Sequence, residues 1–283
     1  MYAVTGATGE LGRLAVAALA KKTSPDQIVA IVRSADKAAD VLPEGVEIRI
    51  ADYDQPATLA PALDGVTHLL LISSNDLQSR QRQHRDVIEA AKSAGVAFIA
   101  YTSILKADTS PIGLAETHRD TEAAIRESGI SHAMLRNSWY FENYLAGLPT
   151  TLEHGVMIGA AGDGRISAAT RADYAEAAAT VLANGETGVF ELGGDTSFTM
   201  SELAAEISRQ TGRDIPYKDM SESAYADALQ QAGLPAPVAS MLADGDAGIA
   251  KGALHDDSKT LSRLIGRPTT PYSTSIAEGL RTS

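Results

Sequence analysis

The stretch Gly6–Gly12, GATGELG, decides the fold of this chain. It follows a short apolar run at residues 2–4 and precedes a segment whose apolar residues recur with the spacing of one helix face, at positions 11, 14, 15, 18 and 19. Glycines at the point where a strand turns into a helix are typical of dinucleotide-binding proteins. The spacing is GxxGxxG rather than the common GxGxxG, and glycines also mark ordinary turns, but the strand–helix frame favours a cofactor site.

Each glycine has a physical role in that interpretation. Gly6 permits a tight turn, Gly9 lets the backbone approach a pyrophosphate, and Gly12 lets the helix pack closely on the sheet. Backbone N–H groups at the helix start, with the positive end of the helix dipole, attract phosphate. The predicted cofactor-binding turn therefore consists of Gly6, Ala7, Thr8, Gly9, Glu10, Leu11 and Gly12.

Arg33 indicates which dinucleotide binds. It follows Ile28–Val32, a continuous apolar run typical of a parallel strand that is buried on both faces. Enzymes that use NAD usually place an acidic residue here to bind the ribose 2′-hydroxyl, whereas an arginine suits the 2′-phosphate of NADP. A solvated surface arginine is the alternative, but the upstream glycine motif favours NADPH as the cofactor.

Further strands are expected at residues 46–50, 69–72, 97–101 and 132–136, with helical segments between them. This alternation predicts an α/β fold with a doubly wound, Rossmann-like parallel sheet. Ligands bind at the carboxyl ends of such strands. We therefore expect Ser73, Ser74 and Asn75, which follow the strand at 69–72, to line the nicotinamide side of the cleft.

The chain is expected to divide into a nucleotide-binding core, residues 1–136 with 156–192 returning to it, and a smaller region formed by 137–155 and 193–283. The smaller region has mostly short helical segments separated by proline and glycine, which predicts a mostly helical domain over the cleft. At its start, the segment 137–143, NSWYFEN, gathers the only tryptophan with other aromatic residues and amides. Core filling and ligand binding both explain this cluster.

The composition excludes several classes of function. A net charge of −12 argues against nucleic acid and anionic membranes as partners. The chain has no cysteine, and its six histidines lack metal-ligand spacing, so we expect no disulfide, no thiol catalysis and no metal. It also has no GxSxG nucleophile elbow, no Walker loop and no apolar run of membrane-spanning length. A strand that begins at residue 2 leaves no room for a signal peptide ahead of the motif, and we expect a cytoplasmic enzyme.

Six stretches spread over the chain form a more specific set than any single motif: GATGELG at 6–12, VRS at 32–34, YTS at 101–103, SGI at 128–130, LRNSWYFEN at 135–143 and TRADYAEAA at 170–178. Together they resemble the NmrA-like, atypical short-chain dehydrogenase/reductase family, and the similarity runs over nearly the whole length. The resemblance implies NADPH-dependent, two-electron reduction of small quinones to hydroquinones. The sequence leaves the oligomeric state open.

The resemblance also implies the residues of the site. The NADP(H) site would consist of Gly6–Leu11, Arg33, Ser73–Asn75, Asn137, Ser138, Trp139, Tyr140, Phe141, Glu142 and Arg171. A small C-terminal domain would close a quinone pocket over the nicotinamide, and we expect Tyr140 and Asn143 to contact the substrate. Arg171 enters only through the resemblance.

One departure from the wider superfamily bears on the chemistry. Most short-chain dehydrogenases carry Tyr-x-x-x-Lys as the proton donor and its electrostatic partner, but here Tyr101 and Lys106 are one residue too far apart. Either catalysis is lost, or the substrate needs little acid assistance. A quinone that accepts a hydride becomes a delocalised anion that is much less basic than an alkoxide, so quinone reduction tolerates the missing pair. A non-catalytic NADP-binding redox sensor and a reductase of another conjugated carbonyl or alkene are the alternatives.

His118 is the candidate catalytic side chain. On the helix expected at about 111–128, it shares a face with Thr121 and Glu122. It either hydrogen-bonds the developing oxyanion and relays a proton, or forms a helix-stabilising pair with Glu122. The sequence leaves both hypotheses open.

Overall fold

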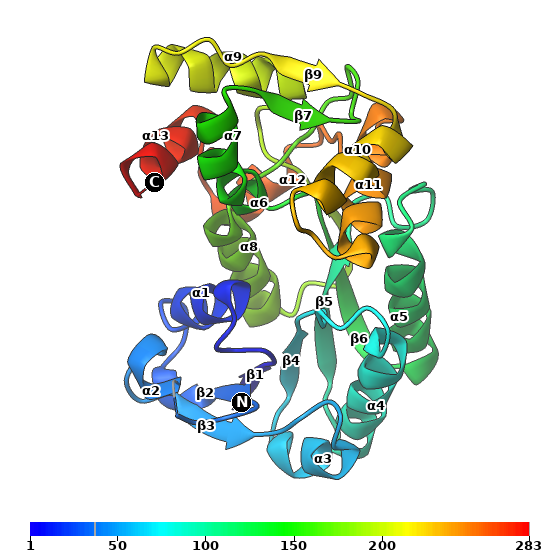
Figure 1. Cartoon of the computed structure of the whole chain (residues 1–283). Coiled ribbons are helices and arrows are strands. Elements are labelled where there is room, and N and C mark those ends of the chain that lie inside the picture. The colour runs from blue at the N-terminus through cyan, green and yellow to red at the C-terminus, as the bar shows by residue number, and fades with distance from the viewer. Residues whose placement is uncertain (37, 283) are drawn as a thin grey trace.

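A computed structural model describes residues 1–36 and 38–282. In this part of the chain, seven parallel strands form the central sheet in the order β3-β2-β1-β4-β5-β6-β8 (Figure 1). These strands are β1 (Tyr2–Val4), β2 (Ile28–Val32), β3 (Glu47–Ile50), β4 (His68–Leu71), β5 (Phe98–Ile104), β6 (Ser131–Asn137) and β8 (Gly188–Leu192). The strand order reverses between β1 and β4, where doubly wound sheets bind their ligands. The predicted α/β fold is confirmed.

Helices cover both faces of the sheet. The first face carries α1 (Glu10–Leu19), α2 (Ala38–Val41), α8 (Arg171–Asn184) and α12 (Thr260–Ile265). The second carries α3 (Leu59–Ala62), α4 (Arg80–Ser93) and α5 (Leu114–Ser128), and short 3₁₀ turns lie at Pro25–Gln27 and Pro56–Thr58. The continuous apolar run of β2 is explained by this arrangement, because Ala30 packs into the first core and Ile31 into the second.

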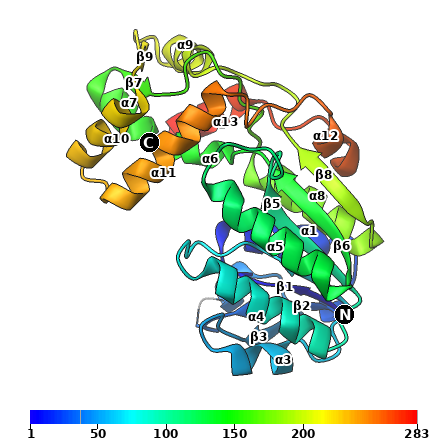
Figure 2. The same cartoon turned by 90° about the vertical axis from the view of Figure 1, so that its right-hand side faces the viewer.

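The remaining elements form a second region that lies against the loops after β5 and β6 (Figures 1 and 2). It contains α6 (Phe141–Ala146), α7 (Leu148–His154), α9 (Met200–Thr211), α10 (Glu222–Gln231), α11 (Ala236–Ala250) and α13 (Tyr272–Thr282), with β7 (Met157–Gly159) paired to β9 (Tyr217–Asp219). Its core combines aliphatic side chains with a cluster of aromatic rings, in which those of Phe198 and Tyr272 are 4.9 Å apart. The capping box of Thr199 and Glu202 begins α9.

The chain returns to the main sheet later than we expected. The segment 156–192 was expected to return as a whole, but β7 in its first part pairs with β9 of the second region. Elements that pack on the main sheet resume at Arg171, where α8 begins, and β8 then pairs with β6. None of the helices among residues 1–36 and 38–282 is both long enough and apolar enough to cross a membrane.

Candidate cofactor site

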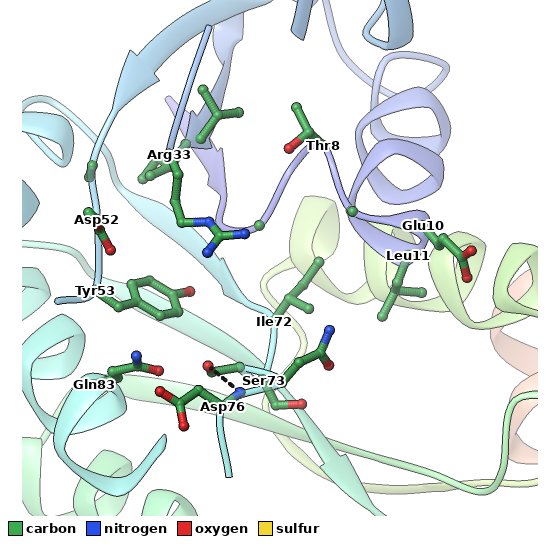
Figure 3. Close-up of a pocket in the computed structure, with 18 of the residues that line it drawn as sticks. Thr8, Glu10, Leu11, Arg33, Asp52, Tyr53, Ile72, Ser73, Asp76 and Gln83 are labelled. Carbon is green, nitrogen blue, oxygen red and sulfur yellow. Dashed lines mark hydrogen bonds between the residues drawn. The ribbon is translucent and has the colours of Figure 1, made fainter. Parts of the chain in front are cut away.

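A cleft of about 590 Å³ opens at the carboxyl ends of β1, β2, β3 and β4, where the strand order reverses. Ligand pockets of several hundred Å³ are the usual size for cofactors. The predicted residues that line it are Gly6, Thr8, Gly9, Glu10, Leu11, Gly12, Arg33, Ser73, Ser74, Asn75, Tyr140 and Arg171 (Figure 3). The sheet thus brings together residues that are up to 165 positions apart in sequence (171 minus 6).

The glycine turn has the geometry that the sequence pattern requires. Gly6 has a φ of +58°, in the left-handed region that favours glycine, and its carbonyl oxygen accepts a hydrogen bond from the N–H of Gly9 at 2.9 Å. A Cβ on Gly12 would lie 2.1 Å from that same oxygen, so α1 can approach the turn only without a side chain there. No side chain in the described part of the chain caps the start of α1, whose first N–H groups are therefore open to a phosphate.

Ala7 differs from the other residues of the turn. Its methyl group is fully buried in the first core, and its N–H donates to the carbonyl oxygen of Ile31 at 3.3 Å. The expectation that Ala7 binds cofactor needs correction, because its side chain and N–H are both engaged within the protein. It shapes the turn between β1 and α1 instead.

Arg33 is exposed at the end of β2, and its side chain extends into the cleft beside the ring of Tyr53 (Figure 3). The neighbouring strand end contributes Asp52 and Asp54, which sequence reasoning did not weigh against this arginine. Asp54 is occupied by hydrogen bonds from Arg82 at 2.5 Å and Gln83 at 3.1 Å, and these lower its pKa. The guanidinium of Arg33 forms no ion pair with any described residue and is thus available to a 2′-phosphate.

The loop Ser73–Asn75 is held from behind by buried side chains. The N–H of Ser73 donates to Oγ1 of Thr102 at 2.9 Å. The N–H of Ser74 donates to Nε2 of His84 at 3.0 Å, and its carbonyl oxygen accepts from Nε of Arg80 at 2.7 Å. Burial lowers the pKa of His84 to about 3, which keeps its ring neutral and Nε2 free to accept. The backbone N–H and the carbonyl oxygen of Ser74 are therefore both held by side chains of α4.

Arg171 begins α8 and closes the cleft beside the glycine turn. Its guanidinium lies 4.8 Å from the centre of the Tyr140 ring and 3.1 Å from a carboxylate oxygen of Glu10. It also donates to Oδ1 of Asn143 at 3.0 Å, while its N–H donates to Oε1 of Glu142 at 2.8 Å. This cluster joins α1, α6 and α8, which explains how a residue without a local motif can belong to the site.

The segment 137–143 contributes both to the wall of the cleft and to the core of the second region. Tyr140 lines the cleft, and the buried Oδ1 of Asn137 has no hydrogen-bond partner among the described residues, so it can accept from a ligand. Trp139 packs on the core of the second region, and Ser138 donates to the carbonyl oxygen of Leu254 at 3.1 Å. These two side chains join the sheet to the second region.

Phe141 needs a second correction. It was expected to bind cofactor, but its ring is 1% exposed and packs in a T-shaped arrangement 5.8 Å from that of Phe198. It belongs to the hydrophobic core of the second region.

His118 lies behind the cleft rather than in its wall. Its side chain is buried, with Nδ1 2.8 Å from the hydroxyl of Tyr101 and Nε2 3.5 Å from Arg80. Burial holds its pKa well below the ordinary value, so the imidazole is neutral. The expected pair with Glu122 is not formed, because that carboxylate instead accepts hydrogen bonds from Arg136 at 2.7 and 2.9 Å.

Sequence reasoning missed one wall of the cleft. Its residues come from the end of β3, the end of β4 and the first turn of α4: Asp52, Tyr53, Asp54, Ile72, Asp76 and Gln83. The strand expected at 46–50 was the signal that could have found those of β3, because ligands bind at the carboxyl ends of parallel strands. Oε1 of Gln83 is buried without a hydrogen-bond partner among the described residues, which points to a polar ligand group nearby.

Four features of the cleft fit a phosphorylated dinucleotide. They are the uncapped start of α1, the close contact of Gly12 with Gly6, the guanidinium of Arg33 without an ion pair among the described residues, and the unpartnered oxygens of Asn137 and Gln83. Such a sheet with such a cleft defines a dinucleotide-binding protein of the Rossmann type. Residues 6–185 match the NAD(P)H-binding protein family, and the chain belongs to that family, in its NmrA-like branch.

Known relatives cover the whole chain. It is 54% identical to quinone oxidoreductase 2 of Escherichia coli K12 over 98% of both chains. The crystal structure of that NADPH-dependent enzyme with NADPH has a TM-score of 0.96, over 98% of this chain and 99% of that one. The NADP(H) complex of triphenylmethane reductase from Citrobacter sp. is 38% identical, with a TM-score of 0.92 over 99% and 100% of the two chains. An NmrA-like family domain-containing oxidoreductase of Aspergillus flavus is 30% identical over 80% of this chain and 76% of its own.

Proposed function

We propose that this protein is an NADPH-dependent quinone oxidoreductase that reduces small quinones to hydroquinones by two-electron transfer. The observation that carries the proposal is the 54% identity to quinone oxidoreductase 2 over 98% of both chains. The cleft supports it independently, because its residues offer phosphate-binding N–H groups and a free arginine where an NADP 2′-phosphate would lie.

The residues proposed to hold the cofactor divide by the group they would bind. The N–H groups of the glycine turn would hold the pyrophosphate, and Arg33 would bind the 2′-phosphate. Ser73–Asn75, Asn137 and Tyr140 would lie along the nicotinamide half, and Arg171 would close the cleft over the turn. When bound, NADPH supplies the hydride, while the protein aligns the two reactants and excludes water.

Proton delivery makes little demand on the protein. A quinone that takes up a hydride becomes a delocalised hydroquinone anion, which is weakly basic and can take its proton from solvent. Tyr101 is fully buried, and His118 is buried behind the cleft. Neither residue is among those that line the cleft, so a proton from either would have to pass through intervening groups. The proposal therefore does not require a side-chain acid in the position of the missing Tyr-x-x-x-Lys pair.

The second region supports a substrate site over the sheet. Its Trp139 and Tyr140 follow the end of β6, and α11 lies beside Trp139, because a Cβ placed on Gly245 would be 4.0 Å from the indole ring. We infer that the second region covers a small quinone, with Tyr140 and Asn143 beside it. A cytoplasmic location stays a prediction.

The test is an anaerobic panel of acceptors with the parent protein. We expect NADPH oxidation with 1,4-benzoquinone and small naphthoquinones, and stoichiometric hydroquinone. Triarylmethane dyes form the second arm of the panel, because the Citrobacter relative is a triphenylmethane reductase at 38% identity. Tight NADPH binding without turnover of any quinone, dye or conjugated carbonyl would favour the sensor alternative.

A further inference from the structure

Two arginines of this chain are equally buried but differ in their partners. Arg80 and Arg136 are each 4% exposed. Arg136 pairs with the carboxylates of Glu122 at 2.7 Å, Asp108 at 2.8 Å and Glu191 at 3.0 Å. Within residues 1–36 and 38–282, no Asp or Glu forms an ion pair with Arg80. A buried charge is ordinarily paired, so Arg80 is the exception that calls for an explanation.

The contacts of Arg80 are all with neutral groups. Nε donates to the carbonyl oxygen of Ser74 at 2.7 Å, and Nη1 donates to Oγ1 of Thr117 at 3.1 Å. Nη1 also lies 3.5 Å from Nε2 of His118. For the third nitrogen, Nη2, the described residues provide no acceptor. The guanidinium is therefore held in one orientation by α5 and the Ser74 loop while its charge stays uncompensated.

Neighbouring titratable groups do not supply the missing negative charge. His118 and His84 are both kept neutral, because burial and the positive charge of Arg80 lower their pKa values. Asp76 acts on Arg80 from a distance, but it is exposed to solvent and accepts hydrogen bonds from its own loop. Burial accordingly lowers the pKa of Arg80, the opposite of what three carboxylates do to Arg136.

The position of Arg80 suggests what the charge is for. Ser74, which it contacts directly, lines the cleft, and so does Tyr140, which is near enough to act on it electrostatically. Both residues follow strands on the β4–β6 side of the sheet, away from Arg33 at the end of β2. If the 2′-phosphate lies at Arg33, the redox-active half of the cofactor and the substrate lie on the side of Arg80.

We propose that Arg80 is a positioned buried cation that stabilises the anion formed on the substrate, and so selects neutral acceptors whose reduced form is a delocalised oxyanion. This inference rests on the proposed quinone reduction. A neutral quinone that accepts one hydride, a proton with two electrons, becomes the hydroquinone monoanion, and a proton from solvent then gives the neutral hydroquinone. A fixed positive charge in a low-dielectric site favours the monoanion without any reorganisation.

The first test reads the charge without turnover. 4-Nitrophenol, a phenol whose coloured phenolate resembles the hydroquinone anion, is titrated with pH on the protein saturated with NADP⁺. We expect the parent to shift the ionisation of the bound phenol toward phenolate by about tenfold, one pKa unit. R80K, which keeps the charge, should retain most of the shift, and R80Q, which keeps only a donor for Ser74, should lose it. R85Q is the matched control, because Arg85 is exposed on the same helix.

The second test is kinetic and uses quinones whose hydroquinones differ in basicity. R80Q should lower kcat/KM by about tenfold or more, and the loss should grow with the basicity of the hydroquinone. R80K should recover most of it, which a merely structural role would not predict. Thermal unfolding shows whether each variant is folded. The comparison of kcat/KM between R80K and R80Q remains valid if one of the two folded variants is less stable than the other.

The outcomes separate this inference from the proposed function. Quinone turnover by the parent tests the function, whereas the difference between R80K and R80Q tests the role of the charge. Equal phenolate shifts in the parent and R80Q, an unshifted phenol in the parent, or no binding of the phenol would each overturn the inference. So would a kinetic loss in R80Q that is the same for every quinone.

Discussion

The imidazole of His118 lies 2.8 Å from the hydroxyl of Tyr101, and both side chains are buried behind the cofactor cleft. This contact links α5, which carries His118, to β5, which carries Tyr101. It also takes His118 away from Glu122, whose carboxylate accepts hydrogen bonds from Ser103 and Arg136. These contacts favour the structural hypothesis for His118, with Tyr101 in place of Glu122 as its partner, and the catalytic hypothesis stays a prediction that kinetics can test.

His118→Ala should therefore affect stability more than catalysis. We expect a loss of about 2 kcal/mol in unfolding free energy, because the variant removes a buried hydrogen bond and leaves a cavity. In steady-state assays, kcat should fall by less than about fivefold with NADPH affinity unchanged. A fall of about 10²-fold in kcat with intact affinity would instead assign proton transfer to His118.

Gly12→Ala tests the close approach of α1 to the glycine turn. An added Cβ would lie 2.1 Å from the carbonyl oxygen of Gly6, and its close neighbours are backbone atoms of Gly6 and Ala7, which cannot move aside as a flexible side chain can. Chemical denaturation should show a loss of about 3 kcal/mol, with NADPH binding weakened in calorimetry. Gly147→Ala is the control, because Gly147 has a φ of −84° and 3.6 Å to its nearest contact. Comparable losses in the two variants would contradict the assigned role of Gly12.

Arg33→Ala tests the choice of cofactor. Removal of a charge-assisted contact should weaken NADPH binding by about 1.5–3 kcal/mol and leave NADH binding nearly unchanged. Titration calorimetry with both cofactors measures the difference. Arg85→Ala removes the same charge from an exposed site outside the cleft and should affect neither. Equal losses for NADPH and NADH in Arg33→Ala would mean that Arg33 does not bind the phosphate.

Asp246 should make the stability depend on pH in an unusual direction. Burial raises its pKa to about 6, above the ordinary 3.8, although its Oδ2 accepts a hydrogen bond from the N–H of Ala160 at 2.9 Å. The folded protein therefore binds this proton more tightly than the unfolded chain, and Asp246 contributes about 2 kcal/mol of added stability as pH falls from about 7 to 4.5. Asp246→Asn keeps an acceptor and removes the titration. Denaturation curves with the same pH slope in both proteins would refute the shift.

Local patterns were enough to predict the sheet and half of the cleft. GATGELG and IVAIV encode a tight turn and a doubly buried strand in contiguous residues, so Gly12 and Arg33 could be placed from the sequence. The β3 wall was missed because that strand is an exposed edge, so its end carried no buried apolar signal. Arg80 and His84 were missed as supports of Ser74 because their role depends on how α4 packs against α5.

The second region was the hardest to predict. Its short β7 and β9 lie 60 residues apart (217 minus 157), and neither has the length or alternation that marks a strand. Phe141 shows the same difficulty at a single residue. It stands within the segment 137–143, of which Tyr140 lines the cleft, but the start of α6 turns its ring into the core against Phe198. The family resemblance, which implied the whole run from Asn137 to Glu142, could not separate the side chains that face the cleft from those that face the core.

Single-turnover stopped flow tests the central claim most directly. The protein is loaded anaerobically with one equivalent of NADPH and mixed with excess 1,4-benzoquinone, and NADPH loss and hydroquinone formation are followed together. Two-electron reduction predicts that one hydroquinone appears for each NADPH consumed, at a rate at least equal to steady-state turnover. NADPH that stays bound and unoxidised in the presence of the quinone would contradict the account.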